Sequence, residues 1–483
     1  MASNPYFSPL HTQRFSFIGS PQQRDGTYQK DQRFLNMYPE LIKSPISDGK
    51  KYYLKKRPGL TNFLQFTPGE GRGIHYWPIN GVLYTCIGNT LYGNDLAILT
   101  LATSQGNVGF CEYRNTTSSL LILCDGVNGY YIDVNSLPTR ITDPNFPSPH
   151  IPAPVFMDGY LLLARGASDV ICNSALGDPT VWPSDGFISA EMYPDNISTL
   201  LINLNYVVAI GTGSVEFLYD NANATGSPLQ RNAPAVSQIG CPAPLTANQT
   251  EKEFIMVGDT ANGGRTIWLF DGFQPTEIAN EPVREALDLE FSAISAASAF
   301  TVQVSGHKFY VLNLIQSSRT FVYDFEEQMW HEWTSGPGQQ VFLYKFATNS
   351  GFGEPTLLGY QTGNVANLNT NPFDLTLDTA GQIVCQVVTT KIDFDTIARK
   401  RYFRLSLATD APDQDVDIIM TVDWSDDDYN TWVGNRSLNL NDEYPTITQL
   451  GISRRRAFRF TFAQPFALRM ESFEVDITQE VRR

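Results

Sequence analysis

Histidine and cysteine are the residues of this chain best suited to metal binding or catalysis, and their spacing favours neither role. The six cysteines form no C-x-x-C pair, and the five histidines do not cluster near them. Zinc sites and disulfide frameworks both need closer and more regular spacing. We therefore predict no metal or other cofactor, and free, buried thiols at Cys86, Cys111, Cys124, Cys172, Cys241 and Cys385.

Other catalytic motifs are weak. Gly211-Thr212-Gly213 lacks the third glycine of a dinucleotide-binding loop, so we interpret it as a hairpin turn. The sequence contains no G-x-S-x-G elbow, Walker A loop or H-E-x-x-H motif. His75 and His331 neighbour aromatic residues and have no second His or Cys close by, so we expect packed or surface side chains rather than ligands.

One short motif needs a separate interpretation. Ser425, Asp427, Thr431 and Trp432 resemble the Asp-box of sialidases, S-x-D-x-G-x-T-W, with Tyr429 in place of the glycine. Such an aspartate accepts backbone N–H bonds in a hairpin turn while the tryptophan packs under the strands. We therefore predict that Asp427 and Trp432 are structural turn residues. A glycosidase would need several copies and converging carboxylates or arginines, so a glycan-degrading enzyme is kept as the alternative.

Basic residues occur in short runs, although the formal net charge of the chain is -16. A generic nucleic-acid binder would show a positive domain or stripe instead. Two interpretations remain for the runs: solvated strand ends that protect sheet edges, or contacts with an acidic surface or with passing phosphates. The second predicts contacts at Lys55, Lys56, Arg57, Arg399, Lys400, Arg401, Arg454, Arg455 and Arg456.

The amino-acid composition predicts the type of secondary structure on which the residues named above lie. The 483 residues include 30 Phe, 22 Tyr, 36 Gly and 29 Pro, and only 17% are charged. This favours strands and turns over amphipathic helices, so we predict an all-β protein. The first residues lack the apolar stretch of a secretory signal, and no apolar run reaches the roughly 18 residues of a membrane span. We expect synthesis in a cytoplasm and no membrane insertion.

A repeat organises the middle of the chain. An apolar strand, a Gly/Asn/Asp turn and a second strand recur seven times, in copies that begin at residues 81, 119, 158, 205, 253, 306 and 355. Their spacing of 38 to 53 residues is near that of propeller blades. Apolar runs such as Leu161-Leu162-Leu163-Ala164 must be covered on both faces, which radial blade packing achieves. We predict a β-propeller, with seven blades favoured and six possible; a β-sandwich with irregular loops is the alternative.

The two ends of the chain differ from the repeat. Residues 380–483 alternate apolar and polar positions, which predicts a small antiparallel β domain with one wet face. We predict that residues 1–60 form an extended arm that packs with this domain, and that residues 61–379 form the propeller. Pro58-Gly59 is expected to form a stiff turn from the arm into the first strand.

Several segments together resemble the tail hub, or nozzle, proteins of short-tailed bacteriophages, which are also called packaged-DNA stabilisation proteins. At the C-terminus the resemblance lies in "SDDDYNTWVGNRS", "LGISRRRAFRFTF" and "RMESFEVDI". Near the N-terminus the matching positions are Asn36-Met37, Arg57-Pro58-Gly59-Leu60, Arg72-Gly73, Gly81, Leu83-Tyr84 and Leu91-Tyr92-Gly93. The loops after residue 100 and around 220–250 do not match.

The resemblance implies a structural protein of the virion tail rather than an enzyme. Six copies would form a ring below the portal and its adaptor, line the lower DNA channel, retain packaged DNA and offer docking for tail fibres or tailspikes and a plug or needle. The basic runs would then contact neighbouring subunits or the adaptor. Acidic walls would suit passage of genomic DNA without sequence-specific binding. A carbohydrate-binding tail protein is a further alternative.

Overall fold

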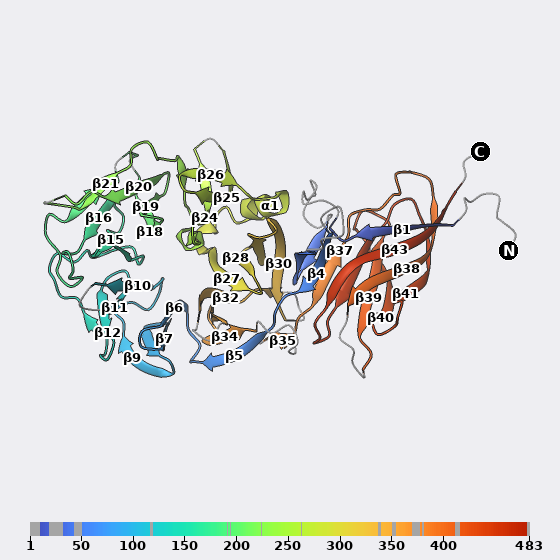
Figure 1. The fold of residues 1–483 in the computed structure, drawn as a ribbon, viewed down its shortest axis with the longest axis horizontal. Coiled ribbons are helices and arrows are strands. Elements are labelled where there is room, and N and C mark those ends of the chain that lie inside the picture. The colour runs from blue at the N-terminus through green and yellow to red at the C-terminus, as the bar shows by residue number, and fades with distance from the viewer. Residues whose placement is uncertain are drawn as a thin grey trace.

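Each of the seven copies of the repeat folds into the two middle strands of one propeller blade. The computed structural model describes residues 10–18, 32–42, 51–115, 119–190, 192–193, 195–223, 225–261, 263–336, 340–349, 354–369, 377–378, 381–410 and 416–480. Within these residues the propeller and a β-sandwich lie next to each other (Figure 1). This confirms the predicted all-β propeller with a second antiparallel domain, and the favoured number of seven blades.

The first four blades follow the chain without interruption. Blade 1 contains β6 (Gly71–Trp77), β7 (Val82–Ile87), β8 (Thr90–Gly93) and β9 (Leu96–Thr100). Blade 2 contains β10 (Gly109–Arg114), β11 (Ser119–Cys124), β12 (Gly129–Asp133) and β13 (Thr139–Arg140). Blade 3 contains β14 (Val155–Met157), β15 (Tyr160–Ala164), β16 (Val170–Asn173) and β17 (Phe187–Ser189). Blade 4 contains β18 (Ile197–Asn203), β19 (Tyr206–Gly211), β20 (Val215–Asp220) and β21 (Leu229–Arg231).

The last three blades complete the ring. Blade 5 contains β22 (Ile239–Gly240), β23 (Asn248–Gln249), β24 (Glu253–Thr260), β25 (Gly263–Asp271) and β26 (Gln274–Glu277). Blade 6 contains β27 (Ser298–Val304), β28 (His307–Leu314), β29 (Arg319–Asp324) and β30 (Met329–Ser335), with β31 (Gln340–Val341) paired to β30. Blade 7 contains β32 (Tyr344–Asn349), β33 (Pro355–Gly359), β34 (Asn364–Leu368) and β5 (Leu60–Gln65).

Hydrophobic cores lie between successive blades and explain the apolar runs of the repeat. Leu161 and Leu163 on β15 face a core shared with blade 2, whereas Leu162 and Ala164 face a core shared with blade 4. All four are fully buried. A strand in the middle of a blade is therefore covered on both faces, as the sequence predicted.

The propeller is closed by a strand from the beginning of the chain. β5 pairs antiparallel with β34, so Leu60 lies opposite Leu368. Pro58-Gly59 thus leads the chain into β5, which is the first propeller strand along the sequence and the outer strand of the last blade. The innermost strands of blades 7 and 1, β32 and β6, lie next to each other and complete the circle.

The sandwich combines both ends of the chain. Its six-stranded sheet has the order β3-β4-β43-β38-β41, with β1 paired to β43. Its other sheet has the order β37-β42-β39-β40. The core between them contains Phe17, Phe34 and Leu54 from the first part of the chain and Phe460 and Phe473 from the last. The bounds are β1 (His11–Ser16), β3 (Met37–Ile42), β4 (Lys51–Lys56), β37 (Cys385–Val388), β38 (Lys400–Asp410), β39 (Ile419–Ser425), β40 (Val433–Asn439), β41 (Thr446–Ser453), β42 (Ala457–Phe462) and β43 (Arg469–Gln479).

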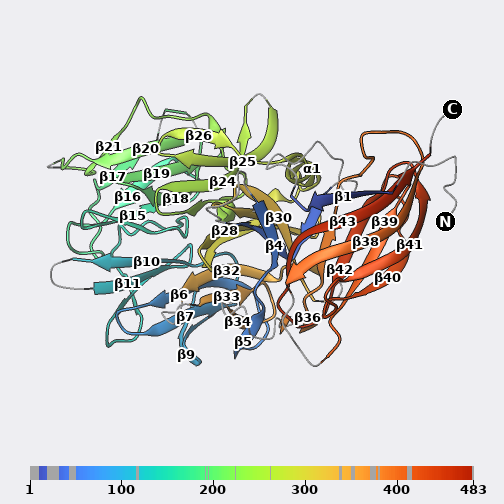
Figure 2. The ribbon, with the colours of Figure 1, turned by 45° about the vertical axis from the view of Figure 1, so that its right-hand side comes forward.

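One sheet runs from the propeller into the sandwich. β2 (Arg33–Leu35) pairs in parallel with the outer strand of blade 6, β30, and antiparallel with β37 of the sandwich. The result is a ten-stranded sheet that includes all of blade 6. Figure 2 shows β30, β4 and β43 meeting at this boundary.

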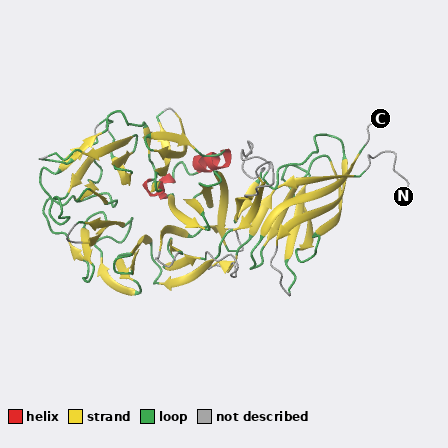
Figure 3. Cartoon of the chain, viewed as in Figure 1, coloured by secondary structure: helices red, strands yellow, loops and turns green. Residues whose placement is uncertain are grey.

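Helices are few (Figure 3). The described residues contain α1 (Glu281–Leu289) and the short 3-10 helices η1 (Pro244–Thr246) and η2 (Ile294–Ala296). A separate two-stranded hairpin consists of β35 (Leu377–Asp378) and β36 (Gly381–Gln382). In the part of the chain that is described, no helix is long and apolar enough to span a membrane.

Candidate functional site

The boundary between propeller and sandwich contains two groups of buried charged side chains, one around Arg57 and one around Glu332. Arg57 follows β4 directly and is fully buried. Its guanidinium donates hydrogen bonds of 2.8 Å to Asn36 Oδ1, to the Pro58 carbonyl and to the Thr334 carbonyl. The aromatic ring of Trp333 lies 5.7 Å from the guanidinium. Arg57 therefore links the arm, blade 6 and the turn into blade 7.

Asn36 completes this link from the arm. Its φ of 55° lies in the left-handed region, which asparagine tolerates better than most residues. Its Nδ2 donates to Thr334 Oγ1 at 2.7 Å and to the Val384 carbonyl at 2.8 Å, while its Oδ1 also accepts from the Thr334 N–H at 2.9 Å. The amide is thus bonded to both the propeller and the segment that leads into β37.

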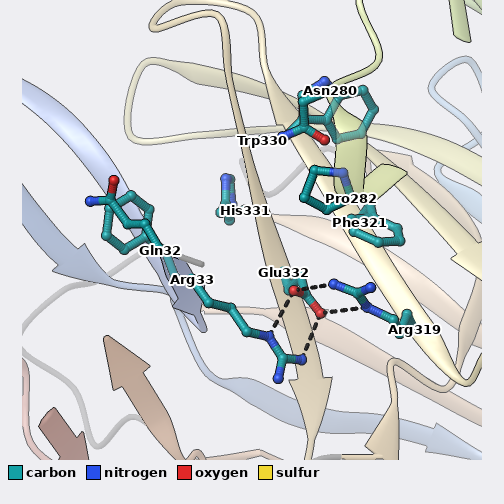
Figure 4. A pocket seen from close by; sticks show the side chains of 10 residues that line it. Gln32, Arg33, Asn280, Pro282, Arg319, Phe321, Trp330, His331 and Glu332 are labelled. Carbon is teal, nitrogen blue, oxygen red and sulfur yellow. Dashed lines mark hydrogen bonds and ion pairs between the residues drawn. The ribbon is translucent and has the colours of Figure 1, made fainter. Parts of the chain in front are cut away.

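A second charged group lies on the outer strand of blade 6 (Figure 4). Glu332 is 6% exposed and accepts bidentate hydrogen bonds from Arg33 on β2, at 2.8 and 2.7 Å. Arg319 on β29 donates to the same carboxylate at 3.1 and 2.7 Å. Burial acts to raise the pKa of Glu332, but the two guanidiniums outweigh it and lower the pKa to about 2. The carboxylate therefore stays ionised and joins the arm to the propeller.

The cavity beside this ion triad is small. It has a volume of about 30 Å³ and is lined by Gln32, Asn280, Trp330 and the triad, among others. That is room for about one ordered water, not for a substrate. The triad is therefore a structural connection, and the cavity beside it offers little space for chemistry.

Two histidines on the other side of β30 are buried. His331 is 3% exposed, and neither ring nitrogen has a hydrogen-bond partner among the described residues. Burial lowers its pKa to about 4, so the ring is neutral near pH 7. His307 Nδ1 lies 2.7 Å from Asp324 Oδ2. Burial acts to lower the pKa of His307, but the hydrogen bond and charge of Asp324 raise it.

His75 lies beside a glutamate and an aromatic ring, and the cysteines are free thiols. His75 Nε2 lies 3.3 Å from Glu112 Oε1 and its ring stacks on Phe110. All six cysteines are free; five are buried and Cys111 is half-buried. Within the described ranges, no group of three or more His, Cys, Asp or Glu side chains could hold a metal ion.

Four of the nine basic residues expected at a partner surface are buried inside this chain, and this corrects the expectation for them. Lys56 donates to the carbonyls of Gln464 and Phe466 at 2.8 and 3.2 Å, and burial lowers its pKa. Arg57 is bonded as described above. Because such side chains are inaccessible, their role is to connect segments of one subunit.

Lys400 and Arg456 are the other two buried cations. Lys400 Nζ donates to the Thr396 and Arg454 carbonyls. Arg456 is 1% exposed, forms two hydrogen bonds of 2.7 Å with Asp426 and stacks on Tyr402 at 4.3 Å. Both therefore stabilise the sandwich rather than a contact with another protein.

The other five basic residues remain candidates for contacts. Lys55 forms an ion pair with Glu40 at 3.4 Å and is partly exposed. Arg455 donates to Asp428 at 2.9 Å and is exposed. The remaining exposed members are Arg399, Arg401 and Arg454.

The Asp-box-like segment forms the turn between β39 and β40. Asp427 Oδ1 accepts from Ser425 Oγ and from the Thr431 N–H, both at 2.9 Å, and Oδ2 accepts from Thr431 Oγ1 at 2.6 Å. These bonds, led by the one from the Thr431 hydroxyl, lower the pKa of Asp427 to about 2. Tyr429 adopts φ 64°, the conformation that the glycine of the motif would supply. The half-buried ring of Trp432 lies 4.5 Å from the Arg459 guanidinium. Asp427 thus organises a turn.

Sequence reasoning missed the partners of Arg57 and the ion triad. Arg33, Arg319 and Glu332 carry no recognisable motif, and Asn36 was noticed only as part of a resemblance. Their pairing depends on contacts between residues nearly 300 positions apart.

A family model described as "Bacteriophage P22 Gp10, beta-propeller" matches residues 17–356. The chain resembles a solved streptogramin B lyase at 11% identity and TM-score 0.43, covering 65% of this chain and 98% of that one. It resembles the N-terminal domain of Nup159 at 10% identity and TM-score 0.40, covering 70% and 98%. A third similar structure is exo-β-1,3-galactanase from Phanerochaete chrysosporium, at 10% identity, TM-score 0.29, and coverage of 76% and 95%. No curated protein matches the chain.

Proposed function

Because the chain belongs to the family described as bacteriophage P22 Gp10, beta-propeller, we propose that six copies of it form a ring in the lower tail. The protein is a structural component of a phage tail, and so of the virion. In our proposal the ring lies below the portal and its adaptor, lines the last part of the DNA channel and retains packaged DNA. Its outer surfaces would hold tail fibres or tailspikes, and its opening a plug or needle.

The observation that carries this proposal is the connection between propeller and sandwich. A ten-stranded sheet passes from blade 6 into the sandwich, and the buried guanidinium of Arg57 is bonded on both sides of the boundary. Hydrogen-bonded strands and buried, fully bonded charges resist relative motion of the two parts. A tube wall that withstands internal DNA pressure needs this stiffness, whereas many two-domain enzymes need a hinge.

The charge of the chain supports the same proposal. A formal net charge of -16 repels phosphate groups, so DNA would pass without adhering. Sequence-specific binding would need a positive surface and base contacts instead. The exposed basic residues then remain available for contacts with neighbouring proteins.

Native mass spectrometry tests the proposal directly. The purified protein is measured alone and after mixing with portal–adaptor complex from the same particle. We expect six copies to add to each adaptor ring. A protein that stays monomeric and never joins the complex would refute the ring and leave a separate binding or glycan-degrading role to be tested on glycan arrays.

A further inference from the structure

The outer face of the six-stranded sandwich sheet carries an exposed patch of mixed basic and apolar character. Arg401 and Phe403 point outward from β38, and Arg401 lies opposite Ile452 on β41. Phe403 is 39% exposed, Ile452 45% and the nearby Ile397 71%. We call this the basic patch, and its members are Ile397, Arg399, Arg401, Phe403, Ile452 and Arg454. Exposed aliphatic and aromatic side chains among arginines are typical of a protein contact surface.

The loops of the basic patch are fixed before any partner binds. The buried ammonium of Lys400 donates to the Thr396 and Arg454 carbonyls, so it joins the two loops from below. Arg454 Nη1 donates to the Ile397 carbonyl at 3.0 Å. Ordering such loops in advance reduces the entropy lost on binding.

A groove of opposite charge lies where the sandwich meets blade 6. It has a volume of about 650 Å³. Its four carboxylates, Glu40, Glu326, Glu327 and Glu471, outnumber its two basic side chains, Arg469 and His307. Glu326 is exposed; the side chain of Glu471 is 45% exposed and forms an ion pair of 3.5 Å with Arg14. We call this the acidic groove.

The two surfaces lie at opposite ends of one strand. Glu471, near the start of β43, lines the acidic groove, whereas Thr478, near its end, lies opposite Arg401 of the basic patch. Seven residues of extended strand separate them by about 24 Å. Two different, complementary surfaces at separate ends of a subunit are what a head-to-tail contact requires, and such contacts form a ring when the rotation between successive copies closes.

We infer that the basic patch of one copy docks into the acidic groove of the next copy. This inference rests on the proposed ring and names the surfaces that form it. Charge complementarity identifies the occupant as a second copy, because the chain offers both signs at separate places. DNA is a poorer occupant, because only the arginines would bind its phosphate groups. The apolar side chains of Ile397, Phe403 and Ile452 would face charged phosphates without a favourable contact.

The test uses charge reversal in the full-length protein. We compare Arg401→Glu/Arg454→Glu, the groove variant Glu326→Arg/Glu471→Arg, and the four-fold combination. Arg140→Glu, an exposed arginine on blade 2, is the matched control. Assembly on the portal–adaptor complex is measured by native mass spectrometry against protein concentration, and thermal melting checks that each variant is folded.

Each double variant is expected to raise at least tenfold the protein concentration at which half of the portal–adaptor complexes carry a ring. The four-fold combination is expected to return this concentration to the wild-type value, and Arg140→Glu is expected to leave it unchanged. Unchanged assembly of both double variants would overturn the inference while leaving the ring intact. Loss without rescue would overturn the assignment of the acidic groove as the counterpart. A wild-type protein that forms no ring would instead refute the proposed function itself.

Discussion

Replacing Arg57 by alanine tests whether the boundary network stabilises the molecule. The change removes three hydrogen bonds from a fully buried cation to Asn36, Pro58 and Thr334. At about 1.5–3 kcal/mol each, these amount to about 5–9 kcal/mol. The variant no longer bears the cost of burying a guanidinium, which offsets several kcal/mol of this loss. We expect the free energy of unfolding to fall by about 3–5 kcal/mol.

The measurement is urea unfolding followed by tryptophan fluorescence, which reports on Trp333 beside Arg57. Lys55→Ala is the matched control, because Lys55 has one partly exposed ion pair and its loss should cost less than about 1 kcal/mol. Arg57→Lys should lose nearly as much as Arg57→Ala, since one ammonium cannot replace the planar fork. Equal stability of Arg57→Ala and Lys55→Ala would refute the reasoning.

Three further predictions concern the same boundary. His331 stays unprotonated in the folded protein down to about pH 4, whereas an unfolded histidine binds a proton below about pH 6.5. The free energy of unfolding should therefore fall by up to about 3 kcal/mol as the pH is lowered from about 6.5 to about 4. If the stability of the wild type and of His331→Phe depended on pH in the same way, this prediction would be contradicted. Glu332→Gln leaves two arginines facing a neutral amide and should cost about 3–5 kcal/mol in urea unfolding; a loss below about 1 kcal/mol would mean that the triad is unimportant. Replacing Pro58-Gly59 by Ala-Ala should impair assembly onto the adaptor more than propeller folding, and normal assembly with only a lower melting temperature would count against a junction role.

The blades were predictable because their signal is local. The middle strands of each blade carry continuous apolar runs, and a turn of Gly, Asn or Asp separates them within about 20 residues. The alternation in residues 380–483 likewise follows from one buried face, as in β42, where Phe458, Phe460 and Phe462 are buried and Arg459 and Thr461 are only partly buried. Both signals are contained in one stretch of sequence.

The boundary network was not predictable for the opposite reason. A run such as Lys55-Lys56-Arg57 normally lies in water, and only distant acceptors make its burial favourable. Those acceptors are backbone carbonyls of Gln464 and Thr334, groups that every residue possesses and that no sequence pattern marks. The three-residue strand β2 is also too short to carry a periodic signal.

The closing strands have a consequence for the order of events during synthesis. β2 and β5 belong to the first 65 residues, yet their partners β30, β34 and β37 lie between residues 329 and 388. Folding of the sandwich can be completed only later, because its strand β43 ends at residue 479. A ribosome-bound chain therefore holds an open arc of blades with unpaired edges for most of its synthesis. A chain that ends before β34 therefore lacks both the closing strand pair of the propeller and the sandwich, whereas a chain that ends between residues 369 and 468 has all seven blades but lacks β43, the strand at the centre of the six-stranded sheet.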